Sequence, residues 1–355
     1  MMTEIDEMVS QKTTVELPEK LEFGRVFTPH LFEMDYDEEK GGWLEPKIVD
    51  FHNLTLHPAA LALHYGLEIF EGLKAYRQVD GKIALFRPEK NFERLNRSAR
   101  RLSMPEVDID LVLSYLKKLI KMDEAWVPDR DGYSLYIRPL MIATDPVLGV
   151  RPGTQYKFLI MLSPVGPYYP EGFKPVSIMA TDKYVRAVRK GVGDCKTGGN
   201  YAASLLAFKE AQSEGYSQVL WLDAIELRYI EEVGTMNMFV VFNDEVATSP
   251  LTGSILPGVT RDSVIRILKD WGYNIQERKV PIDEVFERYK TGELEELFGS
   301  GTAAVIAAIY KLKFKEQVIE FPNEPGELAK KLYGYLTGIQ YGKIEDKYGW
   351  MTYID

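Results

Sequence analysis

The sequence predicts an α+β protein of two domains, and three observations carry this prediction. The chain has 355 residues, 45% of them hydrophobic and 12% aromatic, which is ample for a large core. Strand-like and helix-like patterns follow one another along both halves. Residues 164–175 (PVGPYYPEGFKP) are rich in proline and glycine, as connections between domains often are. We therefore expect a small N-terminal α/β domain over 1–165, an interdomain loop over 166–175 and a large C-terminal domain over 176–355.

The first half of the chain predicts short strands together with two long helices. Residues 1–20 are polar and acidic and are expected to form a mobile head. Phe92, Leu95 and Leu102 recur at helical spacing, and Pro105 marks the end of their helix. The expected elements are strands and turns over 21–51, a short helix over 58–64, a hairpin whose Asp-Gly turn lies within 79–82, helices over 87–102 and 108–122, and strands over 133–141 and 156–162.

The second half interleaves apolar strands with amphipathic helices. The expected elements are strands over 176–180, 218–222 and 236–242 and helices over 201–214, 260–271, 282–290 and 326–340. No internal repeat and no low-complexity tract is visible in the sequence.

Composition narrows the classes of partner. A net charge of −10 creates no general attraction for nucleic acid or for an anionic membrane, so we expect neither as a partner. The single cysteine, Cys195, excludes intrachain disulfides and cysteine-based zinc clusters. The start lacks a basic and apolar leader, and no apolar run reaches membrane-spanning length, so we expect a cytoplasmic protein. All four histidines precede residue 65, which leaves lysine, tyrosine and carboxylates for proton transfer in the second half.

The stretch GVGDCKTGGNY, residues 191–201, is the strongest candidate for a functional segment. Glycines flank Lys196 on both sides, and Tyr201 follows shortly after it. Because glycine lets a bulky group approach the backbone, Lys196 is a candidate to carry a cofactor on its amine. A solvated lysine in a flexible loop accounts for the same local pattern. The downstream segments favour the cofactor.

Three downstream segments supply groups that a phosphate-bearing cofactor needs. Glu232 enters a buried apolar strand, where it needs a cation or a donor such as a protonated pyridine nitrogen; alternatively, it ends a polar turn that faces water. LPGVTR, residues 256–261, leads into a helix whose first N–H groups could hold phosphate, although an ordinary helix capped by Thr260 fits equally well. FGSGTA, residues 298–303, is a second glycine turn. With Ala304 it imitates a dinucleotide fingerprint, but no clear strand precedes it in a βαβ unit.

Lysine amine, tyrosine, buried carboxylate and phosphate site together match the needs of pyridoxal 5′-phosphate. The sequence also resembles the branched-chain amino acid aminotransferases, which are fold-type IV pyridoxal phosphate enzymes. The likeness extends from residue 27 to residue 342 and rests on GVGDCKTGGNY, EVGTMN, LPGVTR and FGSGTA, with FEGLKAY, ERLNRSARRL and SLYIRPL in the first half. It implies a two-domain α+β fold like that of the D-amino acid aminotransferases, with the cofactor between the domains.

The resemblance implies a role for each matching residue. Lys196 would carry the cofactor and move the α-proton, Tyr201 would hydrogen-bond the ring oxygen, and Glu232 would pair with the ring nitrogen. Arg94 would bind phosphate, although its helical pattern alone indicates a surface charge. The residues expected to bind the cofactor are Arg94, Lys196, Tyr201, Glu232, Thr235, the amides of Val259 and Thr260, and Thr302.

The resemblance also implies an apolar substrate pocket in a homodimer. The residues expected there are Phe27, Phe70, Tyr136 and Ala303 around the side chain, Leu148 and Val150 from a second subunit, Tyr65 and Arg138 near the carboxylates, Thr302, and Tyr168 in a mobile lid. Without the resemblance, the aromatic and aliphatic residues among them would be assigned to the core. Some animal members carry Cys-x-x-Cys after the FGSGTA segment; Ala304 and Ala307 stand there in this chain, so thiol regulation at that place is excluded.

The implied reaction moves the amino group between L-leucine, L-isoleucine or L-valine and 2-oxoglutarate, giving branched-chain 2-oxo acids and L-glutamate by a ping-pong mechanism. A D-amino acid aminotransferase or an aminodeoxychorismate lyase would share the cofactor residues, but SLYIRPL and FEGLKAY favour the branched-chain enzymes. Two alternatives belong to other classes: a nicotinamide-dependent oxidoreductase built on Gly299, and a non-catalytic binding protein that uses the phosphate site. Neither explains Lys196, Glu232 and Val259 together.

Overall fold

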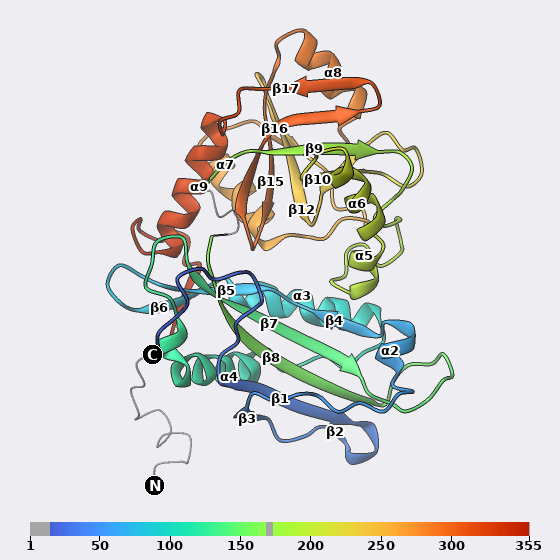
Figure 1. Cartoon of the computed structure of the whole chain (residues 1–355), viewed down its shortest axis with the longest axis vertical. Helices are drawn as coiled ribbons and strands as arrows, with labels where there is room; N and C mark the ends of the chain where they lie inside the picture. Colours follow the sequence, from blue (N-terminus) through green and yellow to red (C-terminus); the bar gives the residue numbers. More distant parts are fainter. Residues whose placement is uncertain (1–14, 168–172, 355) are drawn as a thin grey trace. The chain divides into compact units, whose positions relative to one another are not determined.

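A computed structural model of the chain describes residues 15–167 and 173–354 (Figure 1). They form two compact units, each with its own sheet and its own buried core. The first unit contains the described residues up to 167 together with 338–354, and the second contains 173–337. The stretch 338–354, expected in a C-terminal domain of 176–355, therefore belongs to the first unit, because its final strand pairs with the sheet there.

The first unit is built on an antiparallel sheet in the order β18-β6-β5-β7-β8-β1-β2, with β3 added to β1 and β4 to β7. The long hairpin of β7 and β8 forms its centre. The strands are β1 (His30–Asp37), β2 (Gly42–Trp43), β3 (Lys47–Asp50), β4 (Glu68–Phe70), β5 (Leu73–Arg77), β6 (Ile83–Phe86), β7 (Ser134–Ala143), β8 (Gln155–Val165) and β18 (Met351–Tyr353). The helical elements are α2 (Leu61–Tyr65), α3 (Pro88–Arg101), α4 (Ile109–Met122) and the 3-10 turns η1 (Glu38–Lys40) and η2 (Glu124–Trp126).

Local signals explain the two long helices of this unit. Pro88 occupies the first turn of α3, where its missing N–H is not needed. The Asp108 carboxylate accepts a hydrogen bond from Leu111 N at 3.0 Å and so caps α4. Phe92 and Leu95 of α3 are fully buried in the core of the unit. The predictions of helices over 87–102 and 108–122 are confirmed.

The second unit contains a mixed sheet that closes on itself. Its path is β11-β10-β9-β16-β15-β12-β13-β14, and β11 pairs with β12 as well as with β10, so the strands from β11 to β12 form a ring. β9 lies parallel to both β10 and β16, and β17 is added to β16. The strands are β9 (Val176–Thr181), β10 (Gln218–Leu222), β11 (Ile230–Val233), β12 (Met236–Phe242), β13 (Val246–Thr248), β14 (Ile275–Glu277), β15 (Leu294–Gly301), β16 (Val305–Phe314) and β17 (Gln317–Glu320).

The helices of the second unit are α5 (Gly198–Ala202), α6 (Leu205–Ser213), α7 (Val259–Asp270) and α8 (Ile282–Lys290), together with α9 (Glu327–Gln340), whose last residues belong to the first unit. The single helix predicted over 201–214 is wrong: it is interrupted between α5 and α6. Ser204 lies at the interruption, and its hydroxyl donates to Tyr201 O at 2.7 Å, a local bond that competes with helix continuation. Within the described part of the chain, no helix is both long and apolar enough to cross a membrane.

Candidate active site

The Lys196 loop is anchored on both sides of the lysine. Lys196 Nζ donates to the Tyr201 hydroxyl at 2.7 Å. Asn200 Nδ2 donates to Val192 O at 2.8 Å and to Cys195 O at 3.0 Å, which holds the loop against the start of α5. Lys196 is half-buried, so the interpretation as a solvated lysine in a flexible loop is wrong.

Gly193 explains part of the glycine content of this loop. A Cβ on this residue would lie 2.4 Å from Ser254 O, a backbone atom that cannot move away cheaply. The Lys196 loop and the segment before α7 therefore touch at a point where only glycine fits.

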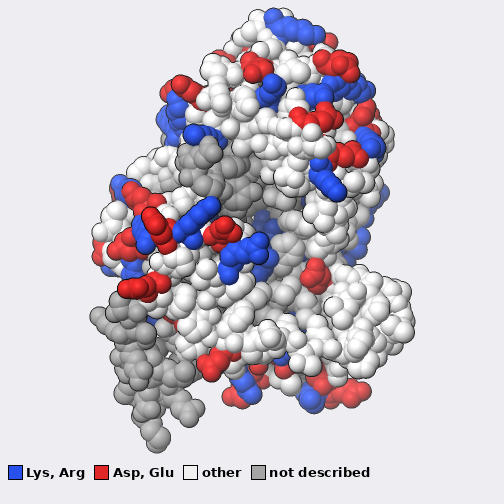
Figure 2. Space-filling model, in the orientation of Figure 1, with Lys and Arg blue, Asp and Glu red and all other residues white. Residues whose placement is uncertain are grey.

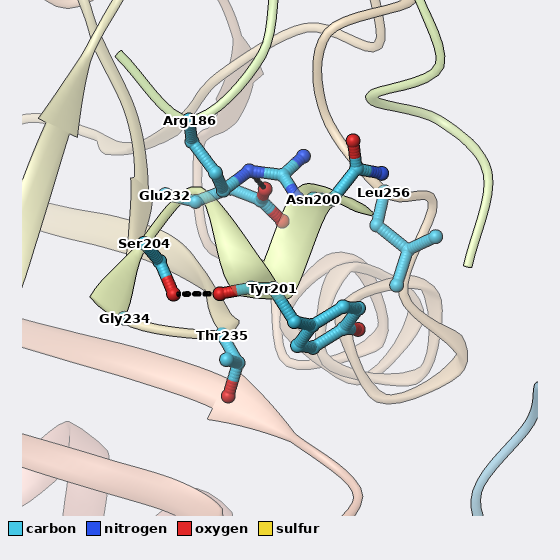
Figure 3. A pocket seen from close by; sticks show the side chains of 8 residues that line it. All are labelled: Arg186, Asn200, Tyr201, Ser204, Glu232, Gly234, Thr235 and Leu256. Atoms are coloured by element: carbon cyan, nitrogen blue, oxygen red, sulfur yellow. Dashed lines mark hydrogen bonds and ion pairs between the residues drawn. The ribbon is translucent and has the colours of Figure 1, made fainter. Parts of the chain in front are cut away.

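Glu232 is buried on β11 between two partners. Its side chain is 4% exposed, its Oε2 lies 2.5 Å from Arg186 Nε, and its Oε1 accepts a hydrogen bond from Asn237 Nδ2 at 3.2 Å. The Arg186 Nε–H does not point at the carboxylate, so this contact is an ion pair and not an aligned hydrogen bond. Figure 3 shows the guanidinium beside the carboxylate. The alternative in which Glu232 faces water is wrong.

Burial raises the pKa of Glu232 to about 7. The positive charges of Arg186 and Lys196 oppose this rise, and the neighbouring Glu231 adds to it. Burial also raises the pKa of Glu231, whose carboxylate accepts a hydrogen bond from Ser254 Oγ at 2.5 Å. A carboxyl group with a pKa near neutrality changes its charge readily when a positively charged ring is placed beside it.

The start of α7 carries no side-chain cap. Gly258 is the N-cap residue, and Thr260 lies inside the helix, so the interpretation of Thr260 as the cap is wrong. A Cβ on Gly258 would lie 2.1 Å from Asn237 Oδ1. Asn237 Nδ2 also donates to Leu256 O at 2.9 Å. Asn237 thus links the Glu232 carboxylate to the turn that precedes the first N–H groups of α7.

A partly open pocket brings several of these side chains together (Figure 3). Its lining residues are Arg186, Asn200, Tyr201, Ser204, Glu232, Gly234, Thr235 and Leu256. Tyr201, Glu232 and Thr235 were predicted to bind a cofactor, so the structure places three predicted residues around one cavity.

The FGSGTA segment forms one side of an antiparallel hairpin. β15 continues through Gly299 to Gly301, Thr302 and Ala303 lie in the turn that follows, and β16 returns beside β15. A dinucleotide fingerprint needs a strand followed by a helix. The hairpin excludes that arrangement, and with it the oxidoreductase built on Gly299.

Arg94 lies in the first unit and is not a surface charge. It is 4% exposed, and its Nε and Nη2 atoms lie 2.6 Å and 2.8 Å from the two carboxylate oxygens of Glu71. Glu71 also accepts from Asn91 Nδ2 at 2.9 Å and from Gly72 N at 3.1 Å. A bidentate carboxylate holds the guanidinium plane in one orientation. The predicted role of Arg94 toward phosphate stays a prediction.

Three predicted substrate residues lie together on the sheet of the first unit. Arg138 Nη2 donates to the Tyr136 hydroxyl at 3.0 Å, and the Arg138 guanidinium carbon lies 4.8 Å from the centre of the Phe70 ring. A Cβ on Gly72 would lie 2.1 Å from the Tyr136 hydroxyl, so glycine is required beside this cluster. Phe27, predicted for the same pocket, is 40% exposed and stacks on Phe51 at 5.2 Å, and its predicted role stays a prediction.

Tyr65 and Leu148 are in contact. The Tyr65 hydroxyl donates to Leu148 O, although we predicted the tyrosine to act near the substrate carboxylates and Leu148 to reach into a second subunit. Leu148 and Val150 are 63% and 83% exposed, in the connection between β7 and β8. In Figure 2, the surface over α2 and this connection is almost free of charged side chains on the face shown. Tyr168 lies outside the described residues.

The family model for class IV amino-transferases matches residues 68–312. The chain belongs to the class IV aminotransferases. Branched-chain-amino-acid aminotransferase 2 of Bacillus subtilis (strain 168) is 52% identical over 349 residues, covering 98% of this chain and 96% of the relative. The branched-chain-amino-acid aminotransferase of Mycolicibacterium smegmatis is 46% identical over 339 residues, with coverages of 94% and 92%.

Solved structures of branched-chain amino acid aminotransferases have the same fold as this aminotransferase. The Escherichia coli enzyme matches with a TM-score of 0.74 at 26% identity, covering 92% of this chain and 99% of that one. The T.th. enzyme with pyridoxamine 5′-phosphate matches with a TM-score of 0.76 at 27% identity, with coverages of 93% and 100%. The resemblance to the branched-chain family and the predicted fold class are confirmed.

Three residues that organise the site in the second unit were not predicted from the sequence: Arg186, Asn200 and Asn237. Glu71, which holds Arg94 in the first unit, was not predicted either. Asn237 stands in the EVGTMN motif, and Glu71 in FEGLKAY, so the motifs contained a signal for both. Asn200 stands next to Tyr201 in the lysine motif. Arg186 had no local signal, because it is one of several cations in RAVRKGVGD, a pattern usually found on solvated surfaces.

Proposed function

We propose that this aminotransferase moves the amino group between L-leucine, L-isoleucine or L-valine and 2-oxoglutarate, with pyridoxal 5′-phosphate carried on Lys196. The observation that carries the proposal is the hydrogen bond between Lys196 and Tyr201. Tyr201 and the buried Glu232, which belongs to the same unit, line one pocket. The printed names of the relatives support the choice of branched-chain substrates. Branched-chain 2-oxo acids and L-glutamate are the products.

The residues present suit this cofactor. Glu232 offers a buried carboxylate for a protonated ring nitrogen, and the start of α7, which no side chain caps, offers the amides of Val259 and Thr260 for phosphate. Tyr201, Thr235, Thr302 and Arg94 would complete its binding site. When bound, pyridoxal phosphate supplies an electron sink that stabilises the negative charge at the substrate Cα.

The chain supplies positioning and proton transfer. Once the incoming amino acid has displaced it, Lys196 Nζ would take the proton from the substrate Cα and pass it to the cofactor carbon. The Tyr201 hydroxyl, 2.7 Å from this amine, keeps it in place. The two substrates react in turn, so one product leaves before the second substrate binds.

The apolar residues select the substrate. Phe70, Tyr136 and Ala303, with Phe27, would surround an aliphatic side chain, while Arg138 and Tyr65 would hold carboxylates. Apolar pockets discriminate single methylenes weakly, so all three branched-chain amino acids should react.

We also propose a homodimer, in which Leu148 and Val150 reach a second copy of the chain. Several exposed apolar side chains lie in this part of the first unit: Leu63 and Tyr65 in α2, and Leu148 and Val150 in the connection between β7 and β8. Val150→Asp should lower the dimer fraction in analytical ultracentrifugation, whereas Val79→Asp, at a hairpin position that is 68% exposed, should not. An unchanged dimer in Val150→Asp would contradict this interface.

The visible absorption spectrum tests the function. The purified protein should show a cofactor band that shifts on adding L-leucine and returns on adding 2-oxoglutarate. Lys196→Ala should lose the band of the lysine-bound cofactor and all steady-state turnover. Lys183→Ala, which removes a surface lysine paired with Glu210, is the control and should behave as the wild type does. A band that leucine leaves unchanged, or turnover by Lys196→Ala, would refute the proposal.

A further inference from the structure

Arg186 connects three separate parts of the candidate active site. Its Nε lies 2.5 Å from Glu232 Oε2 on β11. Its Nη2 donates to Gly193 O in the Lys196 loop at 2.8 Å and to Ser254 O in the segment before α7 at 2.7 Å. One guanidinium therefore holds the carboxylate, the lysine loop and the segment that leads to α7.

The shape of the side chain explains why arginine stands here. The guanidinium is planar and carries several N–H groups in fixed directions, so it can meet a carboxylate with one nitrogen and two backbone carbonyls with another. A lysine has a single nitrogen at the end of a flexible stem. Lysine would keep the charge beside Glu232 but could not keep all three contacts at their distances.

The charges around Glu232 show what Arg186 does for it. Arg186 and Lys196 are the cations that act on this carboxylate, Glu231 is the neighbouring anion, and the backbone of Leu256 contributes a hydrogen bond. Among the influences that favour the ionised form, that of Arg186 is the largest. Burial raises the pKa of Glu232 to about 7 even with Arg186 beside it; without Arg186, burial and Glu231 would favour the neutral acid still more strongly, and a neutral acid cannot compensate the charge of a protonated ring nitrogen.

We propose that Arg186 is a positioning residue, which keeps Glu232 as an anion for the ring nitrogen and ties that anion to the loops that carry Lys196 and the phosphate-binding amides. The proposal rests on the proposed function, since it concerns the same cofactor. Arg186 contacts the carboxylate directly, so its charge acts more strongly on Glu232 than on a ring nitrogen beyond it. Removing the charge should move the shared proton from the ring nitrogen to the carboxylate.

The test uses holoenzyme loaded with pyridoxal phosphate labelled with ¹⁵N in the ring, and NMR reads the protonation of that nitrogen directly. In the wild type at pH 7 the signal should be that of the protonated ring. In Arg186→Met the signal should move toward that of the unprotonated ring. The ratio of protonated to unprotonated ring nitrogen should fall about tenfold or more, which corresponds to about one pKa unit. In Arg186→Lys the shift should be smaller, because the charge remains.

Arg189→Met is the matched control. This neighbouring arginine acts on Glu231 but is not among the largest influences on Glu232, so its removal should leave the ring-nitrogen signal close to the wild-type position. Glu232→Gln gives the reference for a ring nitrogen without its anion. In the Arg186→Met background, Glu232→Gln should change cofactor affinity much less than it does in the wild type, since the two side chains act as one unit.

The outcomes separate the inference from the function on which it rests. A wild type that binds no pyridoxal phosphate overturns both. A wild type with a protonated ring, and the same signal in Arg186→Met and Arg186→Lys, overturns the role of Arg186 and leaves the function standing. If Arg186→Met does not fold, Arg186→Lys decides. The inference is supported if this variant binds the cofactor with a raised dissociation constant and shows a partial shift of the ring-nitrogen signal. It is refuted if both values equal those of the wild type.

Discussion

Replacing Glu232 by glutamine should change how the stability of the cofactor-free chain depends on pH. Burial raises the pKa of Glu232 from 4.5 to about 7. Between these values the folded chain holds a proton that the unfolded chain has lost, so the wild type loses stability as pH rises through this window. At about 1.4 kcal/mol per pKa unit, the loss amounts to roughly 3 kcal/mol, reached near neutral pH.

Glutamine cannot ionise, so Glu232→Gln lacks this loss. At acidic pH Glu232 of the wild type is itself neutral, so replacing the neutral acid by an amide adds only an offset in unfolding free energy that does not vary with pH. The informative quantity is therefore the difference in unfolding free energy between variant and wild type, which should move in favour of the variant by roughly 3 kcal/mol between pH 4.5 and pH 8.

Urea denaturation at a series of pH values measures this difference. Hydrogen exchange of peptides from β11 and β12 locates it, because Glu232 lies on β11 and its partner Asn237 on β12. Glu231→Gln is a useful comparison, since burial raises the pKa of that carboxyl as well and the same sign is expected. A difference that does not vary with pH would refute the reasoning, as would a change in favour of the wild type.

Three further outcomes are expected. Gly258→Ala places a Cβ 2.1 Å from Asn237 Oδ1, and it should weaken pyridoxal phosphate binding at least about tenfold in a fluorescence titration. Gly199→Ala is the control: its Cβ meets nothing within 4 Å, so this variant should bind the cofactor normally. Equal affinities of the two variants would contradict the steric argument. Tyr201→Phe removes the hydroxyl 2.7 Å from Lys196 Nζ, so kcat should fall by roughly tenfold or more while the visible absorption band of the cofactor persists. An unchanged kcat would show that the contact is dispensable. Asp145→Asn weakens a carboxylate that accepts from Thr154 N at 2.8 Å and Gln155 N at 3.1 Å, and should lower the unfolding free energy by roughly 1–3 kcal/mol at pH 7. Burial acts to raise the pKa of Asp145, but these hydrogen bonds outweigh it and the pKa is lowered. The stabilisation by the carboxylate is therefore present at neutral pH and lost in acid. If urea denaturation found the same loss of unfolding free energy in Asp145→Asn at pH 3 as at pH 7, the carboxylate would not be its source.

The parts of the fold that follow from local sequence could be predicted. Helices over 87–102 and 108–122 carry their apolar spacing and their start signals, Pro88 and Asp108, within the segment. The strands over 218–222 and 236–242 are apolar runs bounded by polar residues. The break at Ser204 could not be seen, because a serine within an amphipathic pattern gives no sign of where its hydroxyl will bond.

Contacts between distant segments explain what the sequence left open. Lys196, Tyr201 and Glu232 stand in recognisable motifs, but the partner of Glu232 is Arg186, which no spacing rule connects to it. Likewise, Glu71 holds Arg94 from another element, so the helical pattern of α3 assigned this arginine to the surface. The closure of the ring by β11 depends on pairings to two strands at once, which alternation of apolar residues cannot encode.

The position of β18 has a consequence for synthesis of the protein. β18 pairs with β6, and Trp350 just before it packs edge-on against Phe86 at 5.7 Å. A ribosome releases the chain from its N-terminus, so β6 remains an open sheet edge until all of 173–337 has been translated. An exposed edge strand invites pairing with other chains. A frameshift or premature stop in the second half therefore leaves the first unit unfinished, even though every residue of its other strands has been made.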